Sequence, residues 1–402
     1  MLRSLNGKKI MSRLHLTLVV SMLSMIGPFS IDTYLPSFPE IERDFTISRA
    51  LMTQTLGAYL IAFAVSTLFW GAIADWIGRK PVIIMSLGSY LLASIACASA
   101  NNYEQLLLFR ILQGMGIGGA LISSRAMVRD FLPTKEAQKV MAKSMMLFAI
   151  SPAIAPVIGG WLHDAFGWRS VFWFLAIYAG VLLIYALVIV KESLPKENRN
   201  SIHIKEVTQV YIKTLKNPHF VRLILINAFG FASFFIFIAG APTLLMDILH
   251  LKPNEFYLLF VPVVSGIMLG AFTSNYLVNH FNSRQMINTF LSLMILIALI
   301  NVILSFTITI SPLRSILPLI LYSFSLATIM PVLGVSIINC FPNNRGTASA
   351  MQSFVQMGFN GITANVIVAS LGAIASNFTL AQLALVSIAF ILWKIDKRYR
   401  VK

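Results

Sequence analysis

The chain has 402 residues, of which 57% are hydrophobic and only 11% are charged, and its mean hydropathy is +0.79. Charged residues make up about a quarter of an ordinary soluble chain, so this composition excludes a soluble globular protein. The net charge of +16 is typical of a protein that meets anionic partners, and its distribution along the chain decides which partner is expected.

Twelve apolar stretches divide the chain, each long enough to cross a membrane as a helix. A hydrocarbon core about 30 Å thick needs about 20 helical residues at about 1.5 Å each. The first stretch follows several basic residues but has no small-residue cleavage site, so we expect a retained helix rather than a signal peptide. The spans predict an all-α membrane protein and cover approximately residues 14–35, 51–74, 81–99, 104–124, 141–161, 169–190, 220–246, 256–279, 286–308, 313–338, 347–371 and 377–393.

Basic residues alternate between the two sides of these spans. Most of the 31 Lys and Arg residues fall in the N-terminus, in every second loop and in the C-terminal tail. Because cytoplasmic loops carry the excess of Lys and Arg, both termini are predicted to be cytoplasmic. Contact with anionic lipid head groups accounts for the positive charge, so membrane lipid is the expected partner and nucleic acid is not.

One long polar segment divides the spans six to six. We expect an N-terminal lobe at residues 1–190, a cytoplasmic linker at 191–218 and a C-terminal lobe at 219–402. A weak repeat crosses this linker, since Trp70-Gly71-Ala72 and Leu269-Gly270-Ala271 occupy similar places in the second and eighth spans. Parallel repeats of six helices are typical of two-lobed transporters.

The run WGAIADWIGRKP forms a polar clasp between the second and third spans. We expect Gly71 and Gly78 to allow close backbone approach and Asp75 to accept bonds from helix-end N–H groups, while Arg79 and Lys80 face water. The pattern G-x-x-x-D-x-x-G-R-K at this place resembles the signature of the major facilitator superfamily of transporters. That resemblance implies twelve transmembrane helices in two lobes around a central cavity.

Asp32 is the only carboxylate predicted to lie inside a span, where ionisable groups are expensive. The alternative to a functional role is an acid near the outer end of the first helix that reaches water past Pro36. The run IDTYLPSFPEI around it resembles the first-helix signature of the Bcr/CflA-type drug:proton antiporters. The resemblance implies that this acid couples transport to protons.

Arg110 lies about 9 Å below the outer end of the fourth span. The run RILQGMGIGG that it begins resembles the family's fourth-helix motif, and in the superfamily fold the first and fourth helices border one cavity. Arg110 and Asp32 are therefore expected to face each other and to act together in proton coupling. The alternative is an arginine that snorkels from a lipid-facing helix.

The fifth span contains the run SPAIAPVIGG, with Pro152 and Pro156 one turn apart and a Gly159-Gly160 pair. Prolines bend a helix and paired glycines permit tight helix contact, so an ordinary kinked helix is the alternative to a functional role. The run resembles the fifth-helix signature of the superfamily's antiporters, with Ala155 in place of the usual glycine. The resemblance implies export.

Charged residues after the fourth span predict a conformational lock. Arg129 and Asp130 are expected to form an ion network with Asp75 and Arg79 that holds the lobes together when the cavity opens outward. Surface pairs are often worth only about 0–1 kcal/mol, so a solvated loop is the alternative.

Aromatic and neutral polar side chains at helical spacing are the candidates for substrate contact. Each has helix packing as its alternative, and a site with so few charges suits amphipathic molecules better than sugars or nucleotides. The candidates are Tyr34, Tyr59, Phe63 and Gln113 in the first lobe and Asn227, Phe231, Phe234, Gln352, Gln356 and Asn360 in the second.

The sequence therefore predicts a monomeric transporter of the bacterial inner membrane that exports small amphipathic organic molecules or drugs against protons by alternating access. A same-fold exporter of a dedicated metabolite, such as an amino acid, a sugar or a siderophore, stays open as the alternative, and a passive facilitator is the third. Clustered metal ligands and a G-x-x-x-x-G-K-[ST] phosphate loop are absent from the sequence, so we expect no enzyme, metal or cofactor.

Overall fold

The computed structural model describes residues 11–199, 212, 214–341 and 345–396, and its regular structure there is helical. Twelve of these helical segments are long and apolar enough to cross a membrane, so the predicted number is confirmed. The middle of the predicted linker, residues 200–211, lies outside the described residues. The α-helices are α1 (Arg13–Asp32), α2 (Phe38–Phe45), α3 (Arg49–Ile77), α4 (Arg79–Ala98), α5 (Tyr103–Phe131), α6 (Thr134–Phe166), α7 (Arg169–Val188), α9 (Pro218–Ala239), α10 (Tyr257–Leu277), α11 (Ser283–Thr307), α12 (Pro312–Asn339), α13 (Arg345–Ile362), α14 (Ala369–Leu371) and α15 (Ala375–Ile395).

Short segments of other helical types connect these helices. Two π-helices follow α9 and α13 directly or after a short turn, and π-helical turns are rare and frequently occur at functional sites. They are η3 (Thr243–Ile248) and η6 (Thr363–Val368), and the 3₁₀ turns are η1 (Leu35–Ser37), η2 (Lys196–Asn198) and η4 (Pro253–Glu255).

Polar residues just before the apolar runs set the helix starts. Ser48 accepts a hydrogen bond from the backbone N–H of Leu51 at the start of α3, and Asn102 does the same for Gln105 at the start of α5. Such caps satisfy N–H groups that have no partner inside the helix. Gly78 ends α3 with a φ of 108°, a conformation that residues with a side chain rarely adopt.

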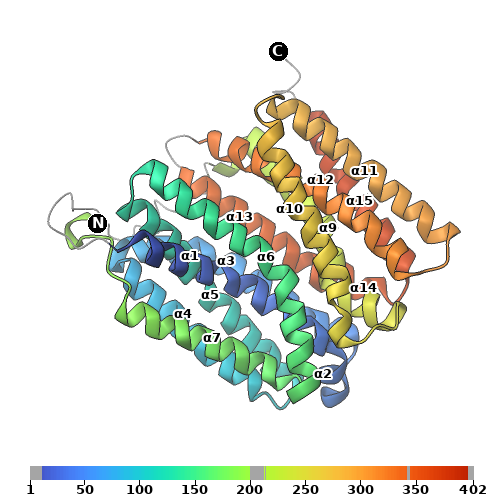
Figure 1. Ribbon diagram of the computed structural model, residues 1–402, viewed down its shortest axis with the longest axis horizontal. Coiled ribbons are helices and arrows are strands. Elements are labelled where there is room, and N and C mark those ends of the chain that lie inside the picture. The colour runs from blue at the N-terminus through green and yellow to red at the C-terminus, as the bar shows by residue number, and fades with distance from the viewer. Residues whose placement is uncertain (1–10, 200–211, 213, 342–344, 397–402) are drawn as a thin grey trace.

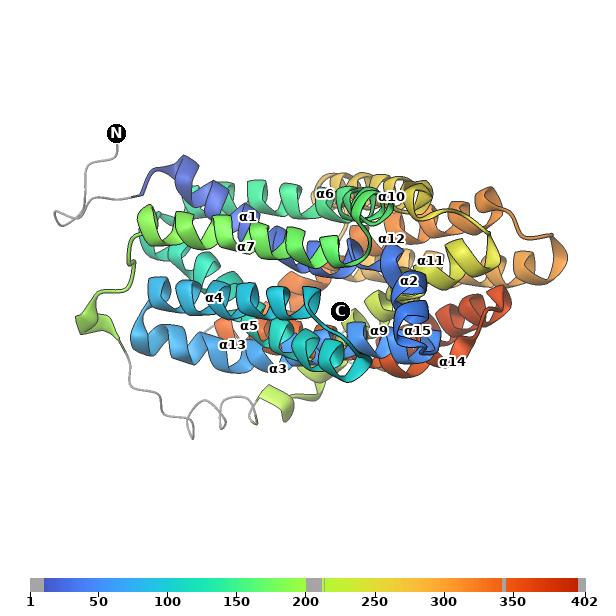
Figure 2. The same ribbon diagram turned by 90° about the horizontal axis from the view of Figure 1, so that it is seen from below.

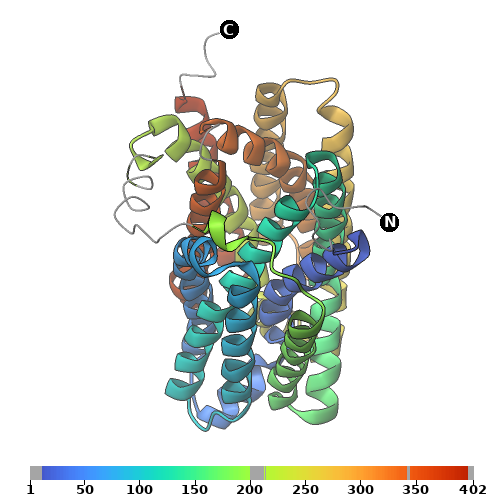
Figure 3. The ribbon, with the colours of Figure 1, turned by 90° about the vertical axis from the view of Figure 1, so that its left-hand side faces the viewer.

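The helices form two groups, the first lobe (α1 to α7) and the second lobe (α9 to α15), seen in Figure 1 and from the left-hand side in Figure 3. Glycines let helix backbones touch inside each lobe. A Cβ on Gly114 of α5 would lie 2.3 Å from the carbonyl oxygen of Tyr59, and one on Gly270 of α10 would lie 2.2 Å from that of Phe324. Close packing through small residues is typical of membrane helices.

The bundle has two ends, which we name by the chain segments that they hold. The termini end carries the start of α1, the α3–α4 turn and the end of α15. The far end carries α2, α14 and the turns at residues 46–48 and 99–102. Figure 2 shows α2 and α14 on the side of the molecule away from the N-terminus.

Several helices extend beyond the predicted spans. α5 continues to Phe131, so the predicted end of the fourth span at residue 124 is too early, and Arg129 and Asp130 lie on the helix rather than after it. α3 likewise runs to Ile77 and leaves Gly78 as the turn. At 29 residues each, these helices are about 43 Å long, and their charged ends project past the hydrocarbon core where an apolar pattern stops.

Candidate functional site between the lobes

Asp32 is the last residue of α1 and is 4% exposed. Among the residues that the structure describes, none forms an ion pair or hydrogen bond with its carboxylate. Its neighbour Thr33 lies under α6, because a Cβ on Gly159 would come within 2.1 Å of the Thr33 carbonyl oxygen. The structure thus places an unpartnered carboxyl group where α1 meets α6.

Arg110 is completely buried in the first lobe and occupies a cage of aromatic rings. Its guanidinium carbon lies 4.8 Å from the centre of the Tyr34 ring and 4.3 Å from that of Tyr59. Nη1 donates a hydrogen bond to Oε1 of Gln113. The ion pairs within 4.0 Å among the described residues do not include Arg110 with Asp32, so the structure does not bring the two expected partners into contact.

Three of the predicted substrate contacts belong to this cage. Tyr34 is 0% exposed and its hydroxyl lies 2.9 Å from that of Thr55, while Tyr59 is also 0% exposed. Gln113 donates through Nε2 to Ser94 at 2.8 Å and accepts from Arg110. In this conformation Tyr34, Tyr59 and Gln113 contact the buried guanidinium of Arg110, and their contact with a substrate stays a prediction.

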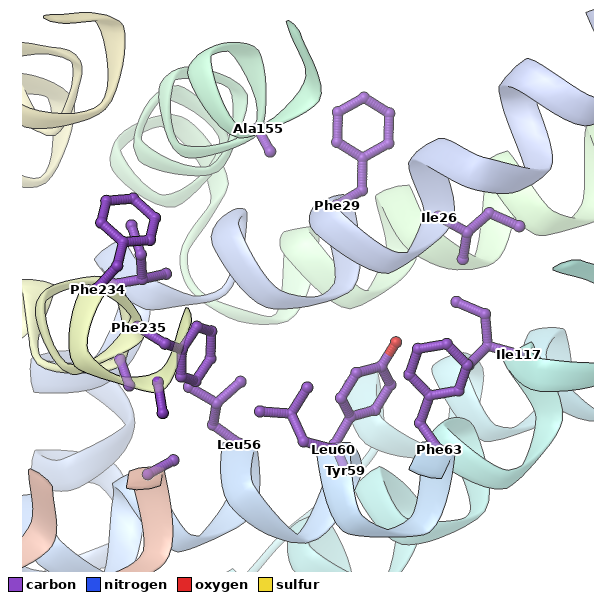
Figure 4. Close-up of a cluster of buried hydrophobic side chains, with 14 of the residues drawn as sticks. Ile26, Phe29, Leu56, Tyr59, Leu60, Phe63, Ile117, Ala155, Phe234 and Phe235 are labelled. Atoms are coloured by element: carbon purple, nitrogen blue, oxygen red, sulfur yellow. The ribbon is translucent and has the colours of Figure 1, made fainter. Parts of the chain in front are cut away.

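The other candidates lie on α3, α9 and α13. Figure 4 shows Phe63 of α3 and Phe234 of α9 among side chains that α1, α3, α5, α6 and α9 point toward a shared interior. Phe63 is 6% and Phe234 4% exposed. In the second lobe, Phe231, Gln352 and Gln356 are partly exposed and Asn227 and Asn360 are buried.

α6 joins the two lobes through the predicted glycine pair. Pro152 and Pro156 lie inside the helix without ending it. Gly159 packs on Thr33 within the first lobe, whereas a Cβ on Gly160 would lie 2.5 Å from the carbonyl oxygen of Pro253 in the second. The tight contact that the glycines predict is confirmed, and it lies at the far end.

The sequence matches the family described as Major Facilitator Superfamily over residues 20–364. The chain belongs to this superfamily. It is 32% identical over 279 residues to an uncharacterized MFS-type transporter, YdgK, of Bacillus subtilis, covering 68% of this chain and 69% of the relative. It is 25% identical over 279 residues to a bicyclomycin resistance protein homolog of Haemophilus influenzae, covering 69% and 70%, and 30% identical over 267 residues to multidrug resistance protein MdtL of Escherichia coli, covering 66% and 67%. The resemblance to Bcr/CflA-type antiporters is confirmed.

Solved structures confirm the fold class. A D-xylose-proton symporter superposes with a TM-score of 0.75 at 16% identity, over 95% of this chain and 97% of that one. A bacterial homolog of the human lysosomal transporter Spinster, in an inward-facing and occupied conformation, gives 0.73 at 17% identity over 96% of each chain. Such low identities show the fold alone. This superfamily member is a multi-pass protein of the bacterial inner membrane that takes a small-molecule substrate.

The superfamily clasp is built differently from the prediction. Glu192, which follows α7, accepts hydrogen bonds from the backbone N–H groups of Arg79 at 3.0 Å and Lys80 at 3.2 Å. Asp75 was expected to accept bonds from helix-end N–H groups, but it pairs with the Arg79 side chain at 2.6 Å. The N-terminus of α4 is therefore capped by an acid from another segment.

The predicted ion network exists in part and lies within the first lobe. Arg79 also reaches Asp130, with Nε 3.5 Å from Oδ2, and Asp130 accepts a hydrogen bond from Ser193 at 2.7 Å. Arg129 forms none of the ion pairs found among the described residues. A Cβ on Gly78 would lie 2.4 Å from the Glu192 carboxylate, so the predicted close approach at Gly78 is confirmed. A Cβ on Gly71 would meet nothing within 4 Å, so the same prediction for Gly71 is wrong.

One ion pair between the lobes was not predicted from the sequence. Arg49, at the start of α3, donates to Asp247 of η3, with Nη1–Oδ2 at 2.7 Å and Nη2–Oδ1 at 3.3 Å. Nη1 also lies 3.2 Å from the Thr243 hydroxyl, and Nε donates to Glu42. We name this the Arg49 latch. In the sequence, Arg49 and Asp247 look like solvated loop charges, and only the folded chain pairs them.

The described residues contain no group of three or more His, Cys, Asp or Glu side chains that is placed to hold a metal ion. What the site offers chemically is one unpartnered carboxyl group, a caged guanidinium and neutral amides around aromatic rings. Such a set can exchange a proton and bind an organic molecule between two lobes.

Proposed function

We propose that this chain exports small amphipathic organic molecules from the cytoplasm in exchange for protons, as a monomer and without catalysing a reaction. Relatives named for multidrug and bicyclomycin resistance support drug efflux. The charge pattern predicts that the termini end faces the cytoplasm. In that orientation the contacts of Gly160 and Arg49 close the far, outer end, and the lobes rock about the bound substrate to expose it on the other side.

The unpartnered carboxyl group of Asp32 carries the proposal. Burying a charge without a partner costs free energy, and no other side chain among the described residues compensates for it at Asp32. Protonation neutralises the carboxylate and removes this cost. Thr33 next to it packs on Gly159, and Gly160 packs on the second lobe. Asp32 is therefore the neighbour of a residue that packs on α6, and α6 contacts the second lobe. A change in the charge of Asp32 can thus affect the contact between the lobes.

Replacing Asp32 tests the proton coupling. Asp32→Asn keeps the size of the side chain and fixes it in a neutral form, so uptake into inverted vesicles driven by a pH gradient should fall to the background level. Binding of an uncharged compound should change by less than about threefold, because no charge on that compound pairs with the carboxylate.

Asp44→Asn is the matched control, since Asp44 is an exposed acid of α2 that pairs with Arg169 inside the first lobe. It should transport like the wild type. If Asp32→Asn still concentrates substrate against its gradient, the proton site lies elsewhere. If the wild type only equilibrates substrate whatever the pH gradient, the chain is a facilitator.

A further inference from the structure

Three amide side chains of the second lobe lie on α9 and α13, and two of them are hydrogen-bonded to each other. Asn227 donates through Nδ2 to Oε1 of Gln356 at 3.1 Å, and Asn360 lies one helical turn after Gln356 on the same face of α13. Asn227 and Asn360 are 1% and 2% exposed. The Oδ1 atoms of both find no hydrogen-bond partner among the residues that the structure describes. We name these residues the amide cluster.

Folding alone does not account for the amide cluster. Buried polar groups are normally hydrogen-bonded, and an unpaired one inside a membrane protein is costly because no lipid group can replace water. An apolar residue of similar size would fill the space of Asn360 without that cost. Retaining two buried amide oxygens without a partner is explained when a ligand donates hydrogen bonds to them.

The amide cluster borders the seam between the lobes. Gly361, the residue after Asn360, packs against α3 of the first lobe, where its Cβ would lie 2.5 Å from Ile61 and 3.0 Å from the carbonyl oxygen of Gly57. On α9, Phe231 and Phe234 follow Asn227 by one and two turns. Figure 4 shows Phe234 in the interior that both lobes share.

A second amide pair of the same lobe provides a comparison. Asn301 of α11 donates to Gln382 of α15 at 3.1 Å, and both side chains are buried, with Nε2 of Gln382 unpaired. α11 packs mainly against α12 and α15, away from the first lobe. The two pairs share the same amide chemistry, and each contains a buried amide atom without a partner, but they differ in their distance from the seam.

We propose that the amide cluster is the polar subsite for the exported molecule and that it takes an uncharged amide, lactam or hydroxyl group. An amide side chain both donates and accepts a hydrogen bond and carries no charge, so it complements groups of that kind. The rings of Phe231 and Phe234 offer an apolar surface for the rest of the molecule. This inference rests on the proposed export function and names its substrate class. Proton and substrate thus use different lobes, Asp32 in the first and the amide cluster in the second.

Direct binding to the purified full-length protein tests the subsite with two probes. Chloramphenicol is uncharged and carries an amide and hydroxyl groups, whereas tetraphenylphosphonium is a cation without hydrogen-bonding groups. Asn360→Leu should raise the Kd for chloramphenicol about tenfold or more, since a site built for hydrogen bonds loses affinity when they are removed. The Kd for tetraphenylphosphonium should stay within about twofold.

Thermal unfolding of the ligand-free protein separates recognition from folding. Asn360→Leu should unfold at the same or a higher temperature than the wild type, because it removes an unpaired polar group. Asn301→Leu should lower the unfolding temperature and leave both Kd values unchanged. A purely structural Asn360 would show the opposite pattern, with lower stability and unchanged binding.

Asn227→Leu is the second variant and should weaken chloramphenicol binding in the same selective way. The proposal is wrong if neither variant changes the Kd for chloramphenicol, if both probes weaken equally, or if the wild type does not bind chloramphenicol. Wild-type protein that binds chloramphenicol through Asn360 but does not export it in vesicles supports the subsite and contradicts the proposed function.

Discussion

At the scale of single residues, the surroundings of Arg110 determine what a substitution there will do. Its guanidinium lies over two tyrosine rings and donates to Gln113 in a fully buried position. A planar guanidinium can stack and hydrogen-bond at once, whereas a lysine ammonium is a compact, strongly hydrated charge. A lysine at position 110 would therefore keep the positive charge but not the contacts with the two rings and Gln113.

Arg110→Lys should lower the free energy of unfolding by about 1–3 kcal/mol, because a cation–π contact is worth about 0.5–2 kcal/mol and the bond to Gln113 is also lost. Thermal unfolding in detergent measures the loss. Arg43→Lys is the control, since Arg43 is exposed on α2 and should leave stability unchanged. An Arg110→Lys protein as stable as the wild type would show that the ring contacts contribute little.

Rarity in a membrane span singled out Asp32 and Arg110 correctly as buried ionisable groups. Their partners were not predictable, because helical rise gives the depth of a residue but not the side of the helix that it faces. Arg110 faces Tyr34 and Tyr59, two of the aromatic side chains that the sequence suggested as substrate contacts.

At the scale of elements, the α3–α4 turn depends on one residue, Gly78, and on the acid above it. Gly78 has a φ of 108°, and a Cβ there would lie 2.4 Å from the carboxylate of Glu192 that caps α4. Both the strained φ and the displaced cap oppose a side chain at this position. Gly71, two turns earlier in α3, has open space around it.

Gly78→Ala should therefore lower the free energy of unfolding by about 1–3 kcal/mol and slow transport, whereas Gly71→Ala should be neutral or slightly stabilising. The two single-methyl changes lie in one motif, so a comparison of their unfolding temperatures isolates the turn. If both changes lowered the unfolding temperature equally, the φ of Gly78 and the Glu192 cap would not distinguish it from Gly71.

Helices and their starts were readable from the sequence because apolar length and polar caps are local signals. The cap on α4 was not readable in this way. Glu192 accepts a hydrogen bond from the backbone N–H of Arg79, which is 113 residues away in the sequence. The clasp pattern suggested Asp75 for that role by proximity. Packing of α7 against α4 brings the more distant acid to the helix end instead.

At the scale of the whole molecule, α3 is held by the two π-helical segments of the second lobe. η3 supplies Thr243 and Asp247 to Arg49, and η6 places Oδ1 of Asn365 where a Cβ on Gly57 would be. π-helical backbone is rare and occurs mostly as single turns at functional sites. Opening of the far end must separate α3 from both segments at once.

The Arg49 latch is the charged part of this contact, and its removal should favour opening of the far end. Arg49 and Asp247 are 22% and 36% exposed, so solvent screens the pair and its contribution is about 1 kcal/mol. Asp247→Asn should then raise the ratio of open to closed molecules about fivefold. Glu42 keeps Arg49 in place after the change, so the local fold of the first lobe should persist.

Spin labels at Asn101 in the first lobe and Thr309 in the second report this opening, because both residues are exposed at the far end. The long-distance population should grow in Asp247→Asn and stay unchanged in Asp44→Asn, whose carboxylate pairs with Arg169 within one lobe at the same end. High salt should shift the wild type in the direction of Asp247→Asn, since ions screen exposed pairs. An unchanged distance distribution in Asp247→Asn would assign the closure of the far end to the Gly160 and η6 contacts alone.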